Sequence, residues 1–139
     1  MKNFLKLMPF FLFLIACQQK IDSKDIQKLN GYWEIEKVVS AEGVKKNYNV
    51  NETIDFFQIK NNVGFRKKVA PQFDGRYLVN NQSEGIKIIE KDNKTYISYT
   101  TPYAKWNEQI IELSDAKLVL KNQQNIEYQY KKSIPFSIK

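Results

Sequence analysis

The sequence predicts an all-β protein, a small up-and-down antiparallel β-barrel of eight to nine strands preceded by a short N-terminal helix. Three observations lead to this fold class. Nine short runs between residues 32 and 131 place hydrophobic residues at alternate positions, as half-buried strands do. Residues typical of turns separate these runs at intervals of about eight to twelve residues. No segment has the apolar period of a long helix, and 139 residues suffice for one domain.

The first predicted element is an export signal over residues 1–16. Lys2 and Lys6 precede an apolar run that is shorter than the roughly 20 residues of a membrane-spanning helix. The run ends in Leu14, Ile15, Ala16 and Cys17, an ending that resembles the lipobox of bacterial lipoproteins. The resemblance implies that the Cys17 thiol is joined to diacylglycerol and that the chain is cut before it and acylated. The alternative is an ordinary signal peptide.

The residues around the predicted cleavage point also favour a location. Gln18 stands where the inner-membrane retention signal of enteric bacteria has Asp, and the acidic run of some surface-exposed lipoproteins of Bacteroidota is missing. By analogy we expect the protein at the periplasmic face of the outer membrane, held in the membrane by acyl chains on Cys17.

The remaining chain divides into a tether, a barrel and a tail. Residues 17–28 are predicted as an acylated tether and a short helix with Asp22 or Ser23 as its N-cap, residues 29–132 as the barrel, and residues 133–139 as a tail that closes one barrel end or frays. Asn61–Asn62 and Asp92–Asn93 are predicted as tight turns. The predicted strands cover residues 32–39, 53–60, 63–69, 75–80, 86–89, 95–100, 107–113, 117–121 and 126–131.

The composition points away from catalysis. The chain has no histidine, and its single cysteine permits neither an internal disulfide nor a cysteine-based zinc site. No phosphate-binding loop, nucleophile elbow or metal motif is present, so we expect no enzyme activity, catalytic residue, metal or cofactor. Without Lys2 and Lys6, 20 basic residues face 15 acidic ones. Because an exported protein meets little nucleic acid and no binding motif accompanies the charge, we expect no nucleic-acid partner.

The start of the first predicted strand resembles the opening of the lipocalins. In that family a short helical turn leads to Gly, any residue and Trp, a pattern that Gly31 and Trp33 match. The resemblance implies that Trp33 packs under the closed end of the barrel. The whole chain resembles the lipocalin-like lipoproteins of Bacteroidota, and residues 64–69 and 74–77 are similar to a segment of those proteins. The mature chain is shorter than a typical lipocalin.

The two arginines of the chain, Arg66 and Arg76, flank one predicted hairpin. If Val69 pairs with Gly75, then Arg66 lies opposite Leu78, and Arg66, Lys68 and Arg76 share one strand face. The other face then has Phe65, Val69, Tyr77 and Val79. We expect the cations to point outward, because unpaired buried cations are rare. Pointing inward, they would bind a carboxylate or phosphate group.

The resemblance implies non-covalent binding of a small, partly hydrophobic ligand by a monomeric barrel. Tyr99, Tyr103 and Trp106 surround the break at Thr101–Pro102, where aromatic side chains either line a ligand entrance or plug one barrel end. Arg66, Arg76 or a tyrosine hydroxyl would fix a polar end of the ligand. The candidate ligand-binding residues are Arg66, Arg76, Tyr77, Tyr99 and Trp106. The alternative function is a protein-binding module, a hydrolase inhibitor or an envelope assembly component, that acts through the barrel loops.

Overall fold

The computed structural model describes residues 20–134, which form one 3-10 helix and ten strands. The helix η1 is Ile26–Leu29. The strands are β1 (Gly31–Val39), β2 (Lys45–Asn47), β3 (Ile54–Lys60), β4 (Val63–Pro71), β5 (Tyr77–Val79), β6 (Glu84–Lys91), β7 (Lys94–Thr100), β8 (Lys105–Leu113), β9 (Lys117–Lys121) and β10 (Glu127–Lys132). Cys17 and the rest of residues 1–19 and 135–139 lie outside the described residues.

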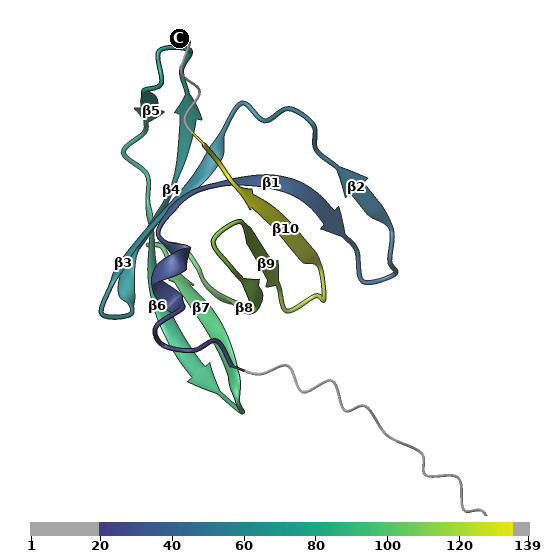
Figure 1. Ribbon diagram of the computed structural model, residues 1–139. Coiled ribbons are helices and arrows are strands. Elements are labelled where there is room, and N and C mark those ends of the chain that lie inside the picture. The colour runs from purple at the N-terminus through teal and green to yellow at the C-terminus, as the bar shows by residue number, and fades with distance from the viewer. Residues whose placement is uncertain (1–19, 135–139) are drawn as a thin grey trace, which may run out of the picture.

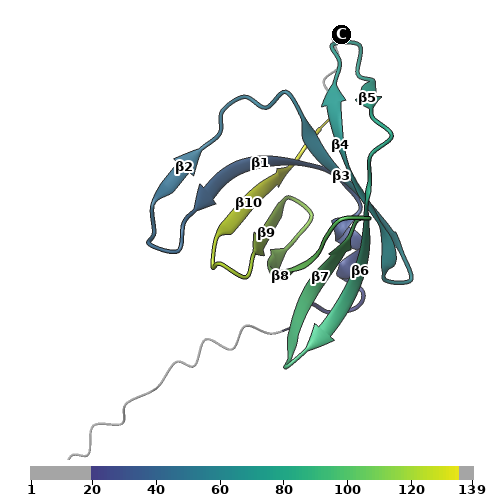
Figure 2. The same cartoon turned by 180° about the vertical axis from the view of Figure 1, so that it is seen from behind.

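Eight of the strands close into a barrel because β1 has a partner on each side. Its first residues pair with β3, and most of its length pairs with β10. Between these partners the order is β3, β4, β6, β7, β8, β9 and β10, with every neighbouring pair antiparallel. The predicted fold class is therefore confirmed. The two additional strands, β2 beside the end of β1 and β5 beside the end of β4, project beyond the barrel wall (Figures 1 and 2).

The two ends of the barrel differ in their connections. At one end, two-residue turns join β3 to β4 and β6 to β7, and their four residues have φ between 52° and 64° (Asn61, Asn62, Asp92 and Asn93). Asn and Asp tolerate this left-handed conformation, which confirms the two predicted turns. At the other end are the longer connections over residues 40–53, which include β2, residues 72–83, which include β5, and the loops over residues 101–104 and 122–126. We call the first the closed end and the second the open end.

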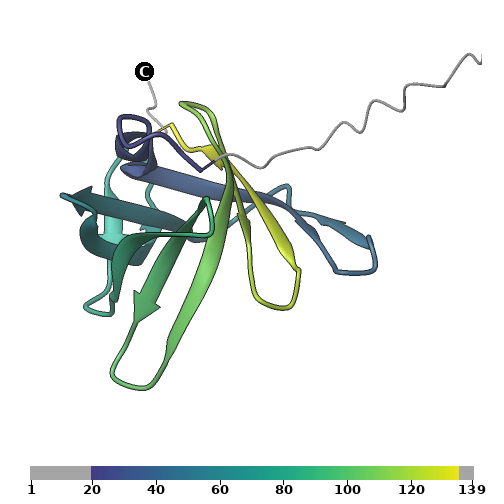
Figure 3. The same cartoon turned by 90° about the horizontal axis from the view of Figure 1, so that it is seen from below.

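Helix η1 packs against the closed end, at the start of β1, while β2 lies near the far end of that strand (Figure 3). Ile26 and Leu29 point into the core. The Trp33 indole Nε1 donates a hydrogen bond of 2.8 Å to the Leu29 carbonyl, and Trp33 has no exposed surface. The expected packing of Trp33 is therefore found, and this residue connects η1 to the barrel.

Strand β1 starts with a glycine because a side chain at this position would clash with its surroundings. Gly31 has a φ of 123°, a conformation that side-chain-bearing residues rarely adopt. A Cβ atom at this position would lie 2.7 Å from the Lys132 Nζ atom, which donates a hydrogen bond of 2.6 Å to the Asn30 carbonyl. The Lys132 ammonium also lies 4.5 Å from the centre of the Trp33 ring. The small residue therefore lets the end of β10 close over Trp33.

The barrel interior is filled by side chains from the closed end to about its middle. Branched and aromatic residues of the inward strand positions form one continuous cluster with η1, as in barrels of eight strands. The members of the cluster are Ile26, Leu29, Trp33, Phe57, Ile59, Ile86, Ile88, Ile97, Tyr99, Ile110, Leu118, Leu120 and Tyr130. Any ligand site inside the barrel therefore lies toward the open end.

The predicted register around Pro71 is wrong. Strand β4 continues to Pro71, which pairs with Tyr77, and Val69 pairs with Val79. The turn lies two residues later than expected, because the backbone N–H of Gln72 donates a hydrogen bond of 2.8 Å to the backbone carbonyl of Arg76. Strand β5 pairs only with Val69–Pro71, and the earlier part of β4 pairs with β6, so Arg66 lies opposite Glu84 instead of Leu78.

The apolar face of β4 is the outer one. Phe65 neighbours the inward-pointing Arg66 in the strand, so its side chain points to the opposite face. There it joins an outer aromatic cluster, in which the Tyr77 ring lies 4.0 Å from that of Tyr32 and the Tyr32 ring lies 4.6 Å from that of Phe56. The expectation that an apolar face marks the interior is wrong for β4.

Two further expectations differ from the structure. The N-terminal helix is a single 3-10 turn whose N-cap is Asp25, not Asp22 or Ser23. The three residues of β2 were not predicted as a strand, because Lys45, Lys46 and Asn47 are exposed and have no apolar alternation.

Gly64 provides a direct test of the packing of β3 against β4. A Cβ atom at Gly64 would lie 1.8 Å from the carbonyl oxygen of Gln58, whereas one at Gly85 would meet nothing closer than 3.5 Å. We expect Gly64→Ala to lower the free energy of unfolding by about 1–3 kcal/mol, since the two strands must separate. Gly85→Ala is the matched control and should change it by less than about 0.5 kcal/mol. Urea unfolding measures both, and equal losses would contradict this packing.

Candidate ligand-binding site

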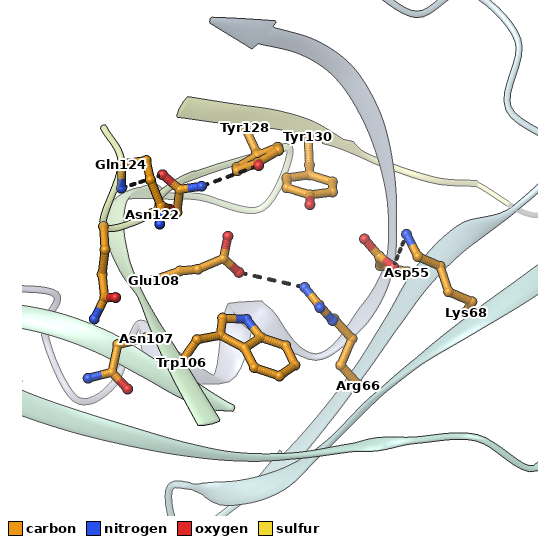
Figure 4. Close-up of a pocket in the computed structure, with 11 residues that line it drawn as sticks. Asp55, Arg66, Lys68, Trp106, Asn107, Glu108, Asn122, Gln124, Tyr128 and Tyr130 are labelled. Carbon is orange, nitrogen blue, oxygen red and sulfur yellow. Dashed lines mark hydrogen bonds and ion pairs between the residues drawn. The ribbon is translucent and has the colours of Figure 1, made fainter. Parts of the chain in front are cut away.

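The open end of the barrel contains a cavity of about 360 Å³. Charged and amide side chains form most of its wall, together with three aromatic rings (Figure 4). Its residues come from β3, β4, β8, β10 and the loop over residues 122–126: Asp55, Arg66, Lys68, Trp106, Asn107, Glu108, Asn122, Gln123, Gln124, Tyr128 and Tyr130. The cavity thus lies directly above the apolar core.

Arg66 is buried at the centre of this site, with a side chain that is 13% exposed. Its Nε atom donates a hydrogen bond of 2.7 Å to Glu84 Oε2, and its terminal nitrogen contacts the same oxygen. The other terminal nitrogen lies 3.6 Å from Glu108 Oε1. The guanidinium also covers the Tyr99 ring, with its carbon 4.3 Å from the ring centre. The predicted outward orientation of Arg66 is therefore wrong, because carboxylates on β6 and β8 compensate the buried charge.

Two carboxylates in the cavity wall are more than nine-tenths buried. Asp55 is 3% exposed and Glu108 is 7% exposed. Asp55 Oδ1 lies 2.8 Å from the ammonium of Lys68, whose side chain is 60% exposed at the rim. Asp55 Oδ1 thus has the Lys68 ammonium as its partner, whereas Glu108 Oε1 and the Tyr99 hydroxyl have no partner with hydrogen-bond geometry among the described residues. The site therefore holds hydrogen-bonding capacity that these residues do not use.

The buried charges influence one another. Burial raises the pKa of Glu108, with Asp55 and Glu84 adding to the rise and Tyr99 and Arg66 opposing it. Burial alone would lower the pKa of Arg66, but Tyr99, Asp55 and Glu84 together hold that pKa above its ordinary value. Burial also raises the pKa of the Tyr99 and Tyr130 hydroxyls. Arg66 is therefore a permanent cation, and the pKa of Glu108 lies above that of an exposed glutamate.

A substitution of Glu108 tests this electrostatic arrangement. The folded-state pKa of Glu108 lies above its ordinary 4.5, so ionisation costs the folded protein stability as the pH rises through the interval between these values. Glu108→Gln is uncharged at every pH. We expect it to be more stable than the wild type near neutral pH, with a difference that shrinks toward zero below the ordinary pKa. Thermal unfolding across this pH range measures the effect, and a variant that is less stable at neutral pH would contradict it.

A second cavity of about 210 Å³ adjoins the first. The two share Asp55, Lys68, Tyr128 and Tyr130. The remaining wall of the second cavity is mainly apolar or aromatic and consists of Trp33, Ile35, Val38, Tyr48, Thr53 and Ile54. A polar compartment and a more apolar compartment therefore meet at the same four side chains.

A comparison with known protein families places this barrel. Residues 29–120 match the model of the lipocalin-like domain, a span that includes η1's last residue and most of the barrel. The chain belongs to the lipocalin-like domain family. Members of this family are typically binding proteins.

Two solved structures resemble this lipocalin-like protein. One is a lipocalin-like protein from Bacteroides uniformis, with 16% identity and a TM-score of 0.49, and the other is an uncharacterized protein from Bacteroides eggerthii, with 15% identity and a TM-score of 0.47. Each match covers 76% of this chain and 99% of the other. No curated protein matches the chain.

Some of the residues predicted from the sequence to bind a ligand come together in the structure of this chain. Arg66, Tyr99 and Trp106 meet at the open end, where the Tyr99 and Trp106 rings stack with centres 5.2 Å apart. Arg76 instead lies on an exposed loop and pairs with Asp74 at 2.7 Å, and Tyr77 belongs to the outer aromatic cluster. These two candidates therefore lie outside the site.

Several residues of the site were not predicted. Asp55 lies in a run of apolar residues, and Glu108 occupies the same strand face as Ile110. An acidic residue at an inward position of the alternating pattern was the available signal. The amide side chains of residues 122–124 join the site through the loop that connects β9 to β10, a contact that strand periodicity does not reveal.

Between residues 20 and 134, no helix has the length and apolar character needed to cross a membrane. In the same part of the chain, no three histidine, cysteine or carboxylate side chains are placed to hold a metal ion.

Proposed function

We propose that this lipocalin-like protein binds a small amphipathic molecule non-covalently at the open end of its barrel. The observation that supports this function most strongly is the junction of the two cavities, one polar and one largely apolar. A ligand pocket typically combines apolar walls with a few placed polar groups. The polar end of the molecule would lie in the larger cavity and its apolar body in the smaller one.

The depth of binding follows from the packing of the core. Ile88, Ile97 and Ile110 belong to the cluster that fills the barrel from its closed end to about its middle. A ligand would therefore rest above this cluster, against Tyr128 and Tyr130, where the two cavities meet. This position differs from a deep apolar cavity that would enclose a whole lipid chain.

Native mass spectrometry of the protein purified from its own source tests the function. We expect a stoichiometric small-molecule adduct that dissociates without breaking a covalent bond. Gln124 lines the cavity, so Gln124→Trp should fill its mouth and remove the adduct. Gln129→Trp, on β10 beside the same end of the barrel, is the control that should keep it. An unliganded wild-type protein, or an adduct that survives Gln124→Trp, would argue against a ligand in this cavity.

We further propose that acyl chains on Cys17 hold the protein at the periplasmic face of the outer membrane. Lys20, three residues after Cys17, lies near the closed end, where it pairs with Glu90 at 3.6 Å. The Ile21 amide donates to Thr95 Oγ1 at 2.9 Å in the same region. Three residues span at most about 10 Å, so an anchor on Cys17 would keep the closed end near the membrane and leave the open end accessible.

Fractionation of cells tests the anchor. The wild-type protein should incorporate labelled palmitate and remain with the outer membrane, whereas Cys17→Ser should lose both properties. Protease added to intact cells should leave the wild-type protein uncut if it faces the periplasm. An unlabelled wild-type protein in the soluble fraction would contradict the anchor, and cleavage in intact cells would contradict the periplasmic location.

Exposed apolar side chains favour a second candidate function, the binding of a protein partner through the open-end loops. Val50, Leu78 and Tyr103 are 88%, 67% and 96% exposed, and they come from three different segments of this end. Exposed apolar groups that gather at one end of a protein are typical of interaction sites. A variant with serine at all three positions should lose a co-purifying protein while keeping the small-molecule adduct, whereas an unchanged protein partner would exclude this candidate.

A further inference from the structure

The charges inside the open end are unbalanced toward the negative. The buried carboxylates of Asp55 and Glu108 line the cavity together with Arg66, whose charge is already paired with Glu84. The second cation of the site, Lys68, has a side chain that is 60% exposed at the rim. Because buried charges require compensation, this arrangement favours an additional positive group in the cavity.

The carboxylate oxygens of the cavity also favour a positively charged hydrogen-bond donor. Glu108 Oε1 accepts no hydrogen bond from any of the described residues, and Asp55 Oδ1 faces only the Lys68 ammonium among them. Both side chains line the same cavity and point toward its interior (Figure 4). An ionised carboxylate only accepts hydrogen bonds, so the missing partner is a donor.

Arg66 is not available to a negatively charged ligand. Its Nε atom and one terminal nitrogen are bound to Glu84, and the other terminal nitrogen faces Glu108. A carboxylate or phosphate that entered the cavity would have to displace these contacts and would meet the like charges of Asp55 and Glu108. The inward-pointing cation therefore serves to hold the acidic residues and does not mark an anion site.

The aromatic walls favour an organic cation. Trp106, Tyr128 and Tyr130 line the cavity that holds Asp55 and Glu108. The faces of such rings attract ammonium groups within about 6 Å of their centres. Across residues 20–134, no side-chain cluster is suited to a metal ion, so carboxylates and aromatic rings together fit an amine better than an inorganic cation.

We propose that the polar end of the ligand is an organic ammonium group that binds between Asp55 and Glu108. This inference rests on the proposed function, and it adds the chemical class of the ligand. The ammonium donates to Glu108 Oε1 and Asp55 Oδ1, its charge offsets the excess of carboxylates, and the attached apolar body lies toward Ile35 and Val38.

Isothermal titration calorimetry with three probes of similar size tests the class. Phenethylamine carries an ammonium group, 2-phenylethanol a neutral hydroxyl group and 3-phenylpropionate a carboxylate on the same phenyl body. We expect the full chain to bind phenethylamine about tenfold or more tightly than either of the others, as for a hydrogen bond to a charged partner. Equal or tighter binding of the alcohol or the acid would overturn the ammonium class while the small-molecule function stands. If no probe binds, the ammonium class is overturned, and the native mass spectrum then decides the proposed function separately.

Two substitutions on β8 test whether phenethylamine binding depends on the Glu108 carboxylate. Glu108→Gln keeps the size of the side chain and removes its charge, and we expect it to weaken phenethylamine binding about tenfold without changing that of 2-phenylethanol. Glu112→Gln is the matched control, because Glu112 lies on the same strand, is solvent-exposed and pairs with Lys117. Unchanged phenethylamine affinity in a folded Glu108→Gln protein, or an equal loss in both variants, would overturn the proposal.

Discussion

Replacement of Arg66 with methionine is expected to lower the free energy of unfolding by about 3–5 kcal/mol, because it leaves buried carboxylates without their cation. Arg66 contacts both Glu84 and Glu108, and its guanidinium also packs over the Tyr99 ring. Methionine retains much of the side-chain volume, so the loss measures the charge more than the packing. Equilibrium unfolding in urea at neutral pH is the appropriate measurement.

Arg76 supplies the control for this experiment. Its side chain is 85% exposed and pairs with Asp74 on the same loop. Exposed ion pairs contribute little, so Arg76→Met should change the free energy of unfolding by less than about 1 kcal/mol. Similar losses in the two variants would mean that Arg66 is not the buried centre of the charge cluster.

Replacement of Trp33 with alanine is expected to lower the free energy of unfolding by a similar amount, about 3–5 kcal/mol. The substitution removes a fully buried ring and the hydrogen bond from its indole to Leu29. It also removes the surface that the Lys132 ammonium covers. We expect faster amide hydrogen exchange in η1, because Trp33 connects this helix to the barrel.

Tyr103→Ala is the control for the loss of an aromatic side chain. Tyr103 is 96% exposed on the loop between β7 and β8, so its removal should be nearly neutral, within about 0.5 kcal/mol. A loss of less than about 1 kcal/mol in Trp33→Ala, or unchanged exchange in η1, would contradict the structural role of Trp33.

The fold was largely predictable because local signals agree with the tertiary structure. Asn61–Asn62 adopts the left-handed turn that its residue types favour, and the alternating pattern of β7 places Ile97 and Tyr99 in the core. The β4–β5 register was not predictable, because the end of β4 depends on a hydrogen bond between Gln72 and Arg76 inside the loop. Local spacing alone permits both registers.

The candidate site was predictable only in part. Trp106 and Tyr99 were found from the break in the chain beside them, and Arg66 was found from its residue type. The orientation of Arg66 was predicted wrongly, because the apolar face of β4 contributes to the outer aromatic cluster and not to the barrel interior. Whether Arg66 can be buried depends on Glu84 and Glu108, which approach it from strands distant in the sequence. The rule that buried cations need partners holds for Arg66, but only the order of the strands shows that β6 and β8 supply these partners.

The two tryptophans of the chain allow the most direct test of the ligand site, because Trp106 lines the polar cavity and Trp33 lines the adjoining, more apolar one. Fluorescence during a titration with phenethylamine can be followed in Trp33→Phe, which retains Trp106, and in Trp106→Phe, which retains Trp33. We predict that the emission of Trp106 changes saturably and that the emission of Trp33, which lines the smaller cavity, changes over the same range of phenethylamine concentration. A saturable change confined to Trp33, or none from either residue, would contradict binding at the open end.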